Sequence, residues 1–154
     1  MRSHSHLISA ARSSGGEVAN QEFLAESKHY ANAYDQTSMY SEYLAKCYVA
    51  RLLRPDRCDN FMWITWSAFG TTVWSDLMSV ERVRKAVLGE YERALGVDDS
   101  ADAESKISND LCADVANRLW IIVLSERQEK HLVLTAEHQG LIRRHIAEEA
   151  AKSG

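Results

Sequence analysis

Glu26 and His29 are the two residues whose types and spacing come closest to a chemical site. On a helix, side chains three residues apart share one face, and in di-iron helical bundles two Glu-x-x-His units of this kind converge on the metals. A second unit is missing, because no glutamate stands three residues before His131, His138 or His145. We therefore predict no metal centre and no cofactor, and keep Glu26 and His29 as candidate polar groups of a ligand site.

Aromatic residues gather close to this pair in the sequence. The uncharged run between Asp59 and Asp76 carries three of the four tryptophans, and four of the six tyrosines lie at 34–48. On a helix, Gly70 would leave a notch rimmed by indoles, in which a ligand could sit. Close approach of a neighbouring helix is the alternative reason for a glycine there. The candidate ligand-binding residues are Trp63, Trp66, Gly70, Trp74, Tyr40, Tyr43, Tyr48, Glu26 and His29.

Histidines spaced by seven residues mark a second candidate surface near the end of the chain. Residues seven apart on a helix are about 10 Å apart, too far to bind one metal ion together. With the leucines between them they form a seam, which predicts pairing with a protein partner or a second copy of the chain. A solvated helix is the alternative. The candidate interface residues are His131, Leu134, His138, Leu141 and His145.

Motifs for catalysis are missing from the sequence. It lacks Gly-x-Ser-x-Gly, Gly-x-x-x-x-Gly-Lys-Ser/Thr and His-Glu-x-x-His, and Cys47, Cys58 and Cys112 have no local signature. We predict no catalytic residue and a helical protein-interaction or binding module. The alternative is a small-molecule-binding domain or an enzyme, with an aromatic pocket for a small apolar or aromatic ligand and Glu26 and His29 as its polar groups.

Length and charge narrow the class of protein. A chain of 154 residues predicts one domain, at 17–154, after a flexible tail at 1–16 that is rich in Ser, Gly, Arg and His. The net charge of -4 offers no positive surface for nucleic acid. Apolar runs are shorter than the roughly 20 residues that span a membrane. Three cysteines without a pairing pattern favour a reducing compartment, so we expect a cytoplasmic protein.

Helix formers and a single proline predict that most of the chain is helical. The clearest helix covers 80–95, where apolar residues recur with a 3.6-residue period. Ser79 would cap its start and Gly96 its end. Pro55 ends a second helix at 37–54, because proline pushes the residue before it out of the helical region. Further helices are predicted at 17–34, 60–78, 102–125 and 126–152.

Two segments also fit strands, at 119–124 and 131–135, because both are rich in β-forming residues. The residues between them lack the Gly, Asn or Pro of a tight hairpin, which favours helix. The Trp-rich run at 60–78 gathers its large apolar residues on one helical face. We therefore predict an all-α fold, a compact bundle of about five or six helices with a buried Trp-rich central helix.

Overall fold

The computed structural model describes residues 5–12, 20–28, 36–66, 71–125, 127–128, 140, 143–144 and 147–148. The chain divides into two compact units, Met1–Leu124 and Ser125–Gly154. All the helices and strands named below belong to the first unit. The predicted interface residues His131, Leu134, His138, Leu141 and His145 lie outside the described residues.

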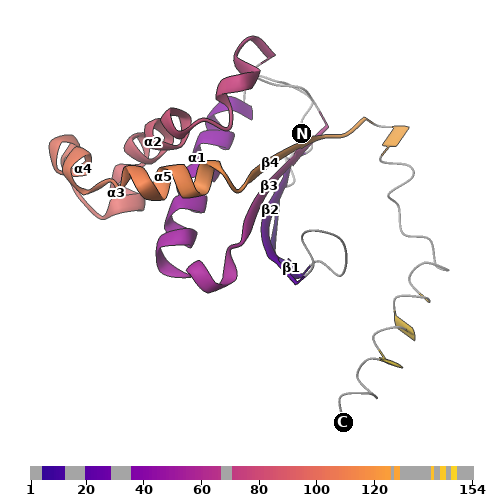
Figure 1. The fold of residues 1–154 in the computed structure, drawn as a ribbon. Helices are drawn as coiled ribbons and strands as arrows, with labels where there is room; N and C mark the ends of the chain where they lie inside the picture. The colour runs from indigo at the N-terminus through magenta and orange to yellow at the C-terminus, as the bar shows by residue number, and fades with distance from the viewer. Residues whose placement is uncertain are drawn as a thin grey trace. The chain divides into compact units, whose positions relative to one another are not determined.

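In the described part of the chain, four strands form one mixed sheet (Figure 1). They follow the order β1 (Ser5–Arg12), β2 (Glu22–Lys28), β3 (Asn60–Thr65) and β4 (Leu119–Val123). The first two strands pair antiparallel, whereas β2, β3 and β4 pair in parallel. Parallel neighbours need a long crossover, and α1 (Gln36–Leu53) provides the one between β2 and β3.

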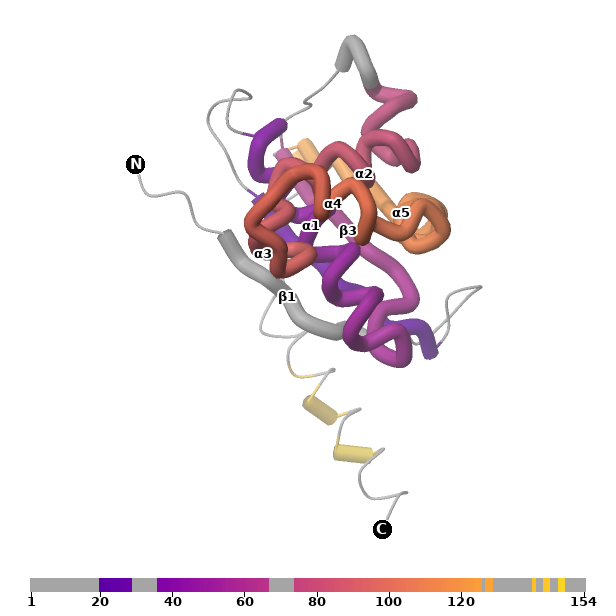
Figure 2. Tube along the Cα trace, turned by 90° about the vertical axis from the view of Figure 1, so that its left-hand side faces the viewer, coloured from indigo at the N-terminus to yellow at the C-terminus, as the bar shows by residue number. Residues whose placement is uncertain are grey.

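Where the structure describes it, the connection from β3 to β4 contains short helices. The helices of the first unit lie on one side of the sheet, as the two views in Figures 1 and 2 show. None of them is long and apolar enough to cross a membrane. The helices after β3 are η4 (Thr71–Asp76), α2 (Val80–Gly89), α3 (Tyr91–Leu95), α4 (Ser100–Lys106) and α5 (Asn109–Ala116).

Local signals place several helix ends where the sequence predicts them. The Ser79 hydroxyl accepts a hydrogen bond from the backbone N–H of Arg82 at 3.1 Å and caps α2. Gly96 follows α3 with a positive φ of 63°, which glycine adopts without steric cost. Pro55 stands just beyond the end of α1 and begins the short 3-10 helix η3 (Pro55–Arg57). These three helix ends are confirmed, because each depends on neighbouring residues alone. The single helix predicted at 80–95 is wrong, since it divides at Glu90 into α2 and α3.

The Trp-rich run does not form the predicted core helix. It begins with β3, in which Phe61, Trp63 and Thr65 are buried and the residues between them are half-buried. This alternation has the period of two that a strand requires. Pairing with β2 on one side and β4 on the other makes β3 a central strand of the sheet. The prediction was wrong because a short apolar run fits either period.

The all-α fold class is therefore wrong, and the protein is mixed α/β. Residues 22–28 of the predicted first helix form β2, and residues 5–12 of the segment predicted as a tail form β1. The helix predicted at 102–125 divides into α4, α5 and β4, so the strand alternative holds for 119–123. The other alternative strand, at 131–135, lies outside the described residues.

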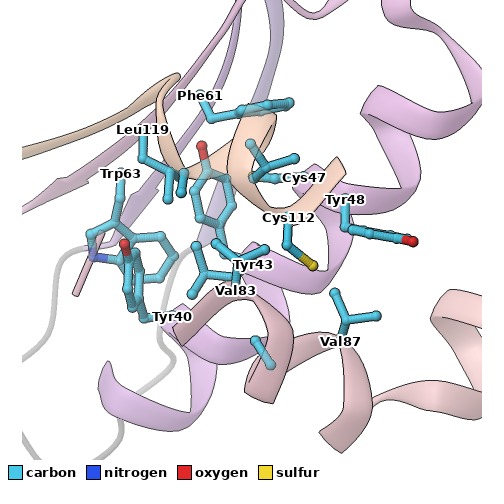
Figure 3. Close-up of a cluster of buried hydrophobic side chains, with 14 of the residues drawn as sticks. Tyr40, Tyr43, Cys47, Tyr48, Phe61, Trp63, Val83, Val87, Cys112 and Leu119 are labelled. Atoms are coloured by element: carbon cyan, nitrogen blue, oxygen red, sulfur yellow. The ribbon is translucent and has the colours of Figure 1, made fainter. Parts of the chain in front are cut away.

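The hydrophobic core lies between the sheet and the helices α1, α2 and α5 (Figure 3). Tyr40 and Tyr43 of α1 pack against Trp63 of β3, with ring centroids 5.4 and 5.2 Å from the indole. Val83 and Val87 of α2 close the cluster from the side of the helices. The inner face of the sheet is therefore covered by aromatic and aliphatic side chains, which surround the polar groups described next.

Candidate functional site

The carboxyl ends of the parallel strands β2 and β3 bring a group of polar residues together. Lys28 at the end of β2 pairs in register with Thr65 at the end of β3. Gln36 is the first residue of α1 and therefore reaches the same edge of the sheet. In open α/β sheets, ligands bind outside the carboxyl ends of the strands. Its position therefore makes the carboxyl edge of the sheet a candidate ligand-binding site.

Glu26 and Lys28 form an ion pair there. They are alternate residues of β2 and so project from the same face of the sheet. The Lys28 Nζ lies 2.7 Å from Oε1 of Glu26, and the two side chains are only 4% and 3% exposed. The other carboxylate oxygen, Oε2, lies 3.4 Å from the Nζ of Lys46 on α1. One carboxylate thus faces two ammonium groups.

Stability does not account for the burial of Glu26 and Lys28. Removing each ion from water costs several kcal/mol, and the attraction between them only offsets that cost. Apolar side chains of similar volume at the same positions would make the sheet about as stable or more stable. Buried charged pairs of this kind at a sheet edge are therefore candidates for binding or catalysis.

Gln36 and Thr65 add a second polar pair to the edge. The Thr65 hydroxyl donates to Oε1 of Gln36 at 3.1 Å, and both residues are 0% exposed. The Gln36 Nε2 has no hydrogen-bond partner among the described residues. Leaving such a donor buried costs about 1–3 kcal/mol. The Gln36 amide nitrogen can therefore donate a hydrogen bond to a ligand at the carboxyl edge.

Aromatic rings line the inner face next to this polar edge. Trp63 is the register partner of Glu26 and packs against Tyr40 and Tyr43. The Tyr40 hydroxyl donates to the carbonyl of Leu77 and the Tyr43 hydroxyl to that of Leu24, both at 2.8 Å. Burial, with the nearby Cys47 adding to it, raises the pKa of both phenols well above the usual value. The two tyrosines are therefore neutral donors to the backbone.

The structure brings together some of the predicted ligand-binding residues, namely Glu26, Trp63, Tyr40 and Tyr43. Tyr48 lies elsewhere in the core, and its hydroxyl accepts a hydrogen bond from the Ser108 N–H at 3.0 Å. Trp66 directly follows β3, and Trp74 is 43% exposed on η4. Because β3 is a strand, the helical spacing that would group these indoles around a notch does not apply. Gly70 and His29 lie outside the described residues.

Sequence reasoning missed Lys28, Gln36, Thr65 and Lys46. The signal for Lys28 is its position two residues after Glu26, because alternate residues share a face only on a strand. Interpreting this segment as a helix paired Glu26 with His29 instead. Gln36 and Thr65 are far apart in the sequence, and only the pairing of β2 with β3 brings their elements to one edge.

The cysteines are not nucleophiles of this site. Burial raises the pKa of the Cys47 thiol well above its usual value, although a hydrogen bond with Tyr43 opposes the shift. Burial also raises the pKa of Cys58 and of Cys112. All three are free and buried, so they are neutral thiols.

The described residues around Glu26 do not fit a metal ion. The described part of the chain contains no cluster of three or more His, Cys, Asp or Glu side chains that could enclose a metal. Among the buried polar residues described there, Glu26 is the only carboxylate. Its two oxygens face the ammonium groups of Lys28 and Lys46, which a cation would have to displace.

Comparison of the chain with protein family models, with curated proteins and with solved structures gives no match. A mixed α/β fold also does not define a function by itself, because one fold can host many chemistries. The function must therefore be inferred from the geometry and charge of the polar edge formed by Glu26, Lys28, Gln36 and Thr65.

Proposed function

We propose that the protein hydrolyses phosphate diesters, with the polar edge formed by Glu26, Lys28, Gln36 and Thr65 as its active site. The observation that carries this proposal is the buried pair of Glu26 and Lys28 beside a buried amide donor, at the carboxyl ends of two parallel strands. Each of these groups is costly to bury without a ligand. Together they supply a carboxylate, a fixed positive charge and a hydrogen-bond donor.

The charges favour an anionic substrate. Glu26 faces both Lys28 and Lys46, so the three groups leave one positive charge in excess. The first turn of α1 contains no acidic residue, and the positive end of the helix dipole lies near that turn. A phosphate diester carries a single negative charge, which matches this excess. Its non-bridging oxygens are acceptors for the Lys28 ammonium and the Gln36 amide.

Each residue has a separate role in the proposed reaction. Hydrolysis adds water across one P–O bond: the hydroxyl goes to phosphorus and a proton goes to the alcohol that leaves. Glu26 would act as a general base that takes a proton from the attacking water. Lys28 orients the Glu26 carboxylate and stabilises the negative charge that builds on the phosphate oxygens. Gln36 donates to one of those oxygens and so fixes the orientation of the substrate.

A binding module for a protein partner is the second candidate function. It is supported by Trp120 on β4, whose side chain is 48% exposed, and by Leu53 at the end of α1, which is 67% exposed. Exposed tryptophans are frequent among the residues that dominate protein interfaces. A partner that requires Trp120 for binding, while the protein shows no hydrolysis, would favour this function over the first.

We also propose that the protein works in a reducing compartment such as the cytoplasm. The support is that Cys47, Cys58 and Cys112 are all buried free thiols. In an oxidising compartment, cysteines more often form disulfides that stabilise the fold. Labelling of thiols in the unfolded protein, isolated under conditions that block exchange, would give three free thiols if this is correct.

Hydrolysis of bis(p-nitrophenyl) phosphate tests the proposed function directly. Glu26→Gln should lower kcat/KM by at least about 100-fold. The double variant Glu26→Gln/Lys28→Met removes both charges of the buried pair, so it should fold and be equally inactive. Glu81→Gln, an exposed position on α2, is the control and should be fully active.

Other substrates define the range of the activity. The monoester p-nitrophenyl phosphate should react more slowly, because it carries more negative charge than the site can balance. Short single- and double-stranded oligonucleotides test the expectation from net charge that nucleic acid is not bound. Folded wild-type protein that hydrolyses none of these diesters would refute the proposal. So would a folded Glu26→Gln variant with wild-type activity.

A further inference from the structure

A cavity formed by β2, α1 and α3 is not used by the proposed reaction. Its volume is about 360 Å³. This lies in the range of about 300–1,000 Å³ that is usual for ligand pockets, which combine apolar walls with a few polar groups. The charged residues of the wall therefore decide which ligand the cavity can hold. Apolar side chains from all three elements form the rest of the wall, namely Leu24, Ala45, Val49, Ala50 and Ala94.

Three of the four charged residues in this wall already have ion-pair partners. The Lys46 Nζ lies 3.4 Å from Oε2 of Glu26, and Nη1 of Arg93 lies 3.4 Å from Oε2 of Glu90. Glu42 is the fourth, and it forms no ion pair with any residue in the described part of the chain. Glu42 is therefore the charged group of the cavity with which a ligand could pair.

The partner that the sequence offers Glu42 is engaged elsewhere. Lys46 follows Glu42 by four residues on α1, a spacing and order that favour a Glu–Lys pair. In the structure Lys46 instead faces Glu26 on β2. Glu42 is half-buried, so part of its hydration is lost without a cation to replace it. A ligand with a positive charge would supply that cation.

We propose that this cavity binds a small aliphatic amine. The ammonium group of the amine pairs with Glu42, with Glu90 as the other carboxylate in the wall, and the alkyl chain lies against the apolar side chains. Lys46 and Arg93 are 52% and 80% exposed, so water screens their repulsion of the ligand. This inference is independent of the proposed function, because no residue of the polar edge contacts the amine.

Other ligands of the same size match the cavity less well. A carboxylate ligand would be repelled by Glu42, and the two cations of the wall already face carboxylates. A neutral apolar ligand would cover the apolar wall and leave Glu42 without a partner, at a cost in hydration. The positive charge of the amine is therefore the feature that an experiment must test.

Nuclear magnetic resonance of the full-length protein, labelled with ¹⁵N, tests this inference with n-hexylamine as the probe. Hexylamine should shift the amide signals of Ala45, Val49 and Ala94 in a saturable manner. 1-Hexanol has the same chain without the charge and should bind at least about fivefold more weakly. Hexanoate carries the opposite charge and should bind more weakly than hexylamine, because Glu42 repels it.

Variants of the wall separate the two parts of the proposed contact. Glu42→Gln keeps the size of the side chain and removes its charge, so it should weaken hexylamine binding about fivefold and leave hexanol binding within about twofold. Ala94→Leu takes up space in the cavity and should weaken the binding of both probes. Glu81→Gln, an exposed position on α2 outside the cavity, is the matched control and should bind both as wild type does.

Three results would overturn the assignment of an amine. The first is hexanol or hexanoate that binds as tightly as hexylamine. The second is a folded Glu42→Gln variant with wild-type affinity for hexylamine. The third is hexylamine that does not shift the signals of Ala45, Val49 and Ala94 in a saturable manner. None of these results depends on diester hydrolysis, so this inference and the proposed function can fail separately.

Discussion

The two edges of the sheet carry polar clusters that are built differently. At the amino edge, Asp114 of α5 accepts hydrogen bonds from Nε of Arg51 at 2.6 Å and from Nε of Arg118 at 2.7 Å. Arg118 also donates to the carbonyl of Asp59 at 2.9 Å, just before β3 begins. At the carboxyl edge, Glu26, Lys28, Gln36 and Thr65 are almost fully removed from solvent.

The difference separates a structural cluster from a functional one. The amino-edge side chains of Arg51, Asp114 and Arg118 are between 16% and 35% exposed, so their burial costs little. Their hydrogen bonds join α1, α5 and the loop before β3. The carboxyl edge instead combines a costly buried ion pair with the amide donor of Gln36, which has no partner among the described residues. Such costs are tolerated at sites that bind or react.

Replacement of Lys28 should have the largest effect on stability. It tests the difference between the two edges of the sheet. Lys28→Met leaves the Glu26 carboxylate buried with only the half-exposed Lys46, which should lower the free energy of unfolding by about 3–5 kcal/mol. The double variant Glu26→Gln/Lys28→Met should be within about 1 kcal/mol of wild type. Urea denaturation of the three proteins checks both values. A double variant as unstable as Lys28→Met would show that the ion pair is needed for stability.

Replacement of Asp114 should have a smaller effect that falls on stability alone. Asp114→Ala removes the acceptor shared by Arg51 and Arg118, which should lower the free energy of unfolding by about 1–2 kcal/mol. The value is modest because solvent reaches both arginines. Diester hydrolysis by the folded variant should equal that of wild type. A loss of kcat/KM without a loss of stability would contradict the division between the two edges.

Replacement of Gln36 should lower activity and leave stability almost unchanged, the opposite of the replacement of Asp114. Gln36→Leu removes a buried amide nitrogen without a described partner, while Thr65 loses one acceptor, so the free energy of unfolding should change by less than about 1 kcal/mol. Loss of the donor to the phosphate should lower kcat/KM by at least about tenfold. Thermal unfolding and a diester assay on the same sample measure both. Unchanged activity would remove Gln36 from the proposed site.

The pH dependence of stability at the amino edge should be the smallest effect. Burial raises the pKa of Asp114, but hydrogen bonds from Arg118 and Arg51 outweigh it and hold the pKa below its usual value. A lowered pKa in the folded state means that the stabilisation is complete above about pH 4 and is lost as the pH falls through the folded pKa. Urea midpoints between about pH 5 and pH 2.5 should therefore fall less in Asp114→Ala than in wild type. An equal fall of the urea midpoint in both proteins would contradict this expectation.

The sequence predicted some residues of the site and missed others, and the difference has a physical cause. Glu26, Trp63, Tyr40 and Tyr43 were selected from the sequence because charged and aromatic residues stand out in any secondary structure. Lys28 and Thr65 were not, because their role depends on the register between β2 and β3. A residue that acts through its neighbour on another strand carries no local signature of that role.

The sequence by itself determined the helices whose limits are local. Pro55 ends α1 by steric exclusion, Ser79 caps the start of α2, and Gly96 ends α3 with a positive φ. Each of these effects involves only nearby residues. Tertiary structure alone decided that the segments 22–28 and 60–65 are strands. Their apolar residues fit either period, and the hydrogen bonds that select the strand join residues distant in sequence, as at Lys28 and Thr65. That long-range pairing also created the polar edge.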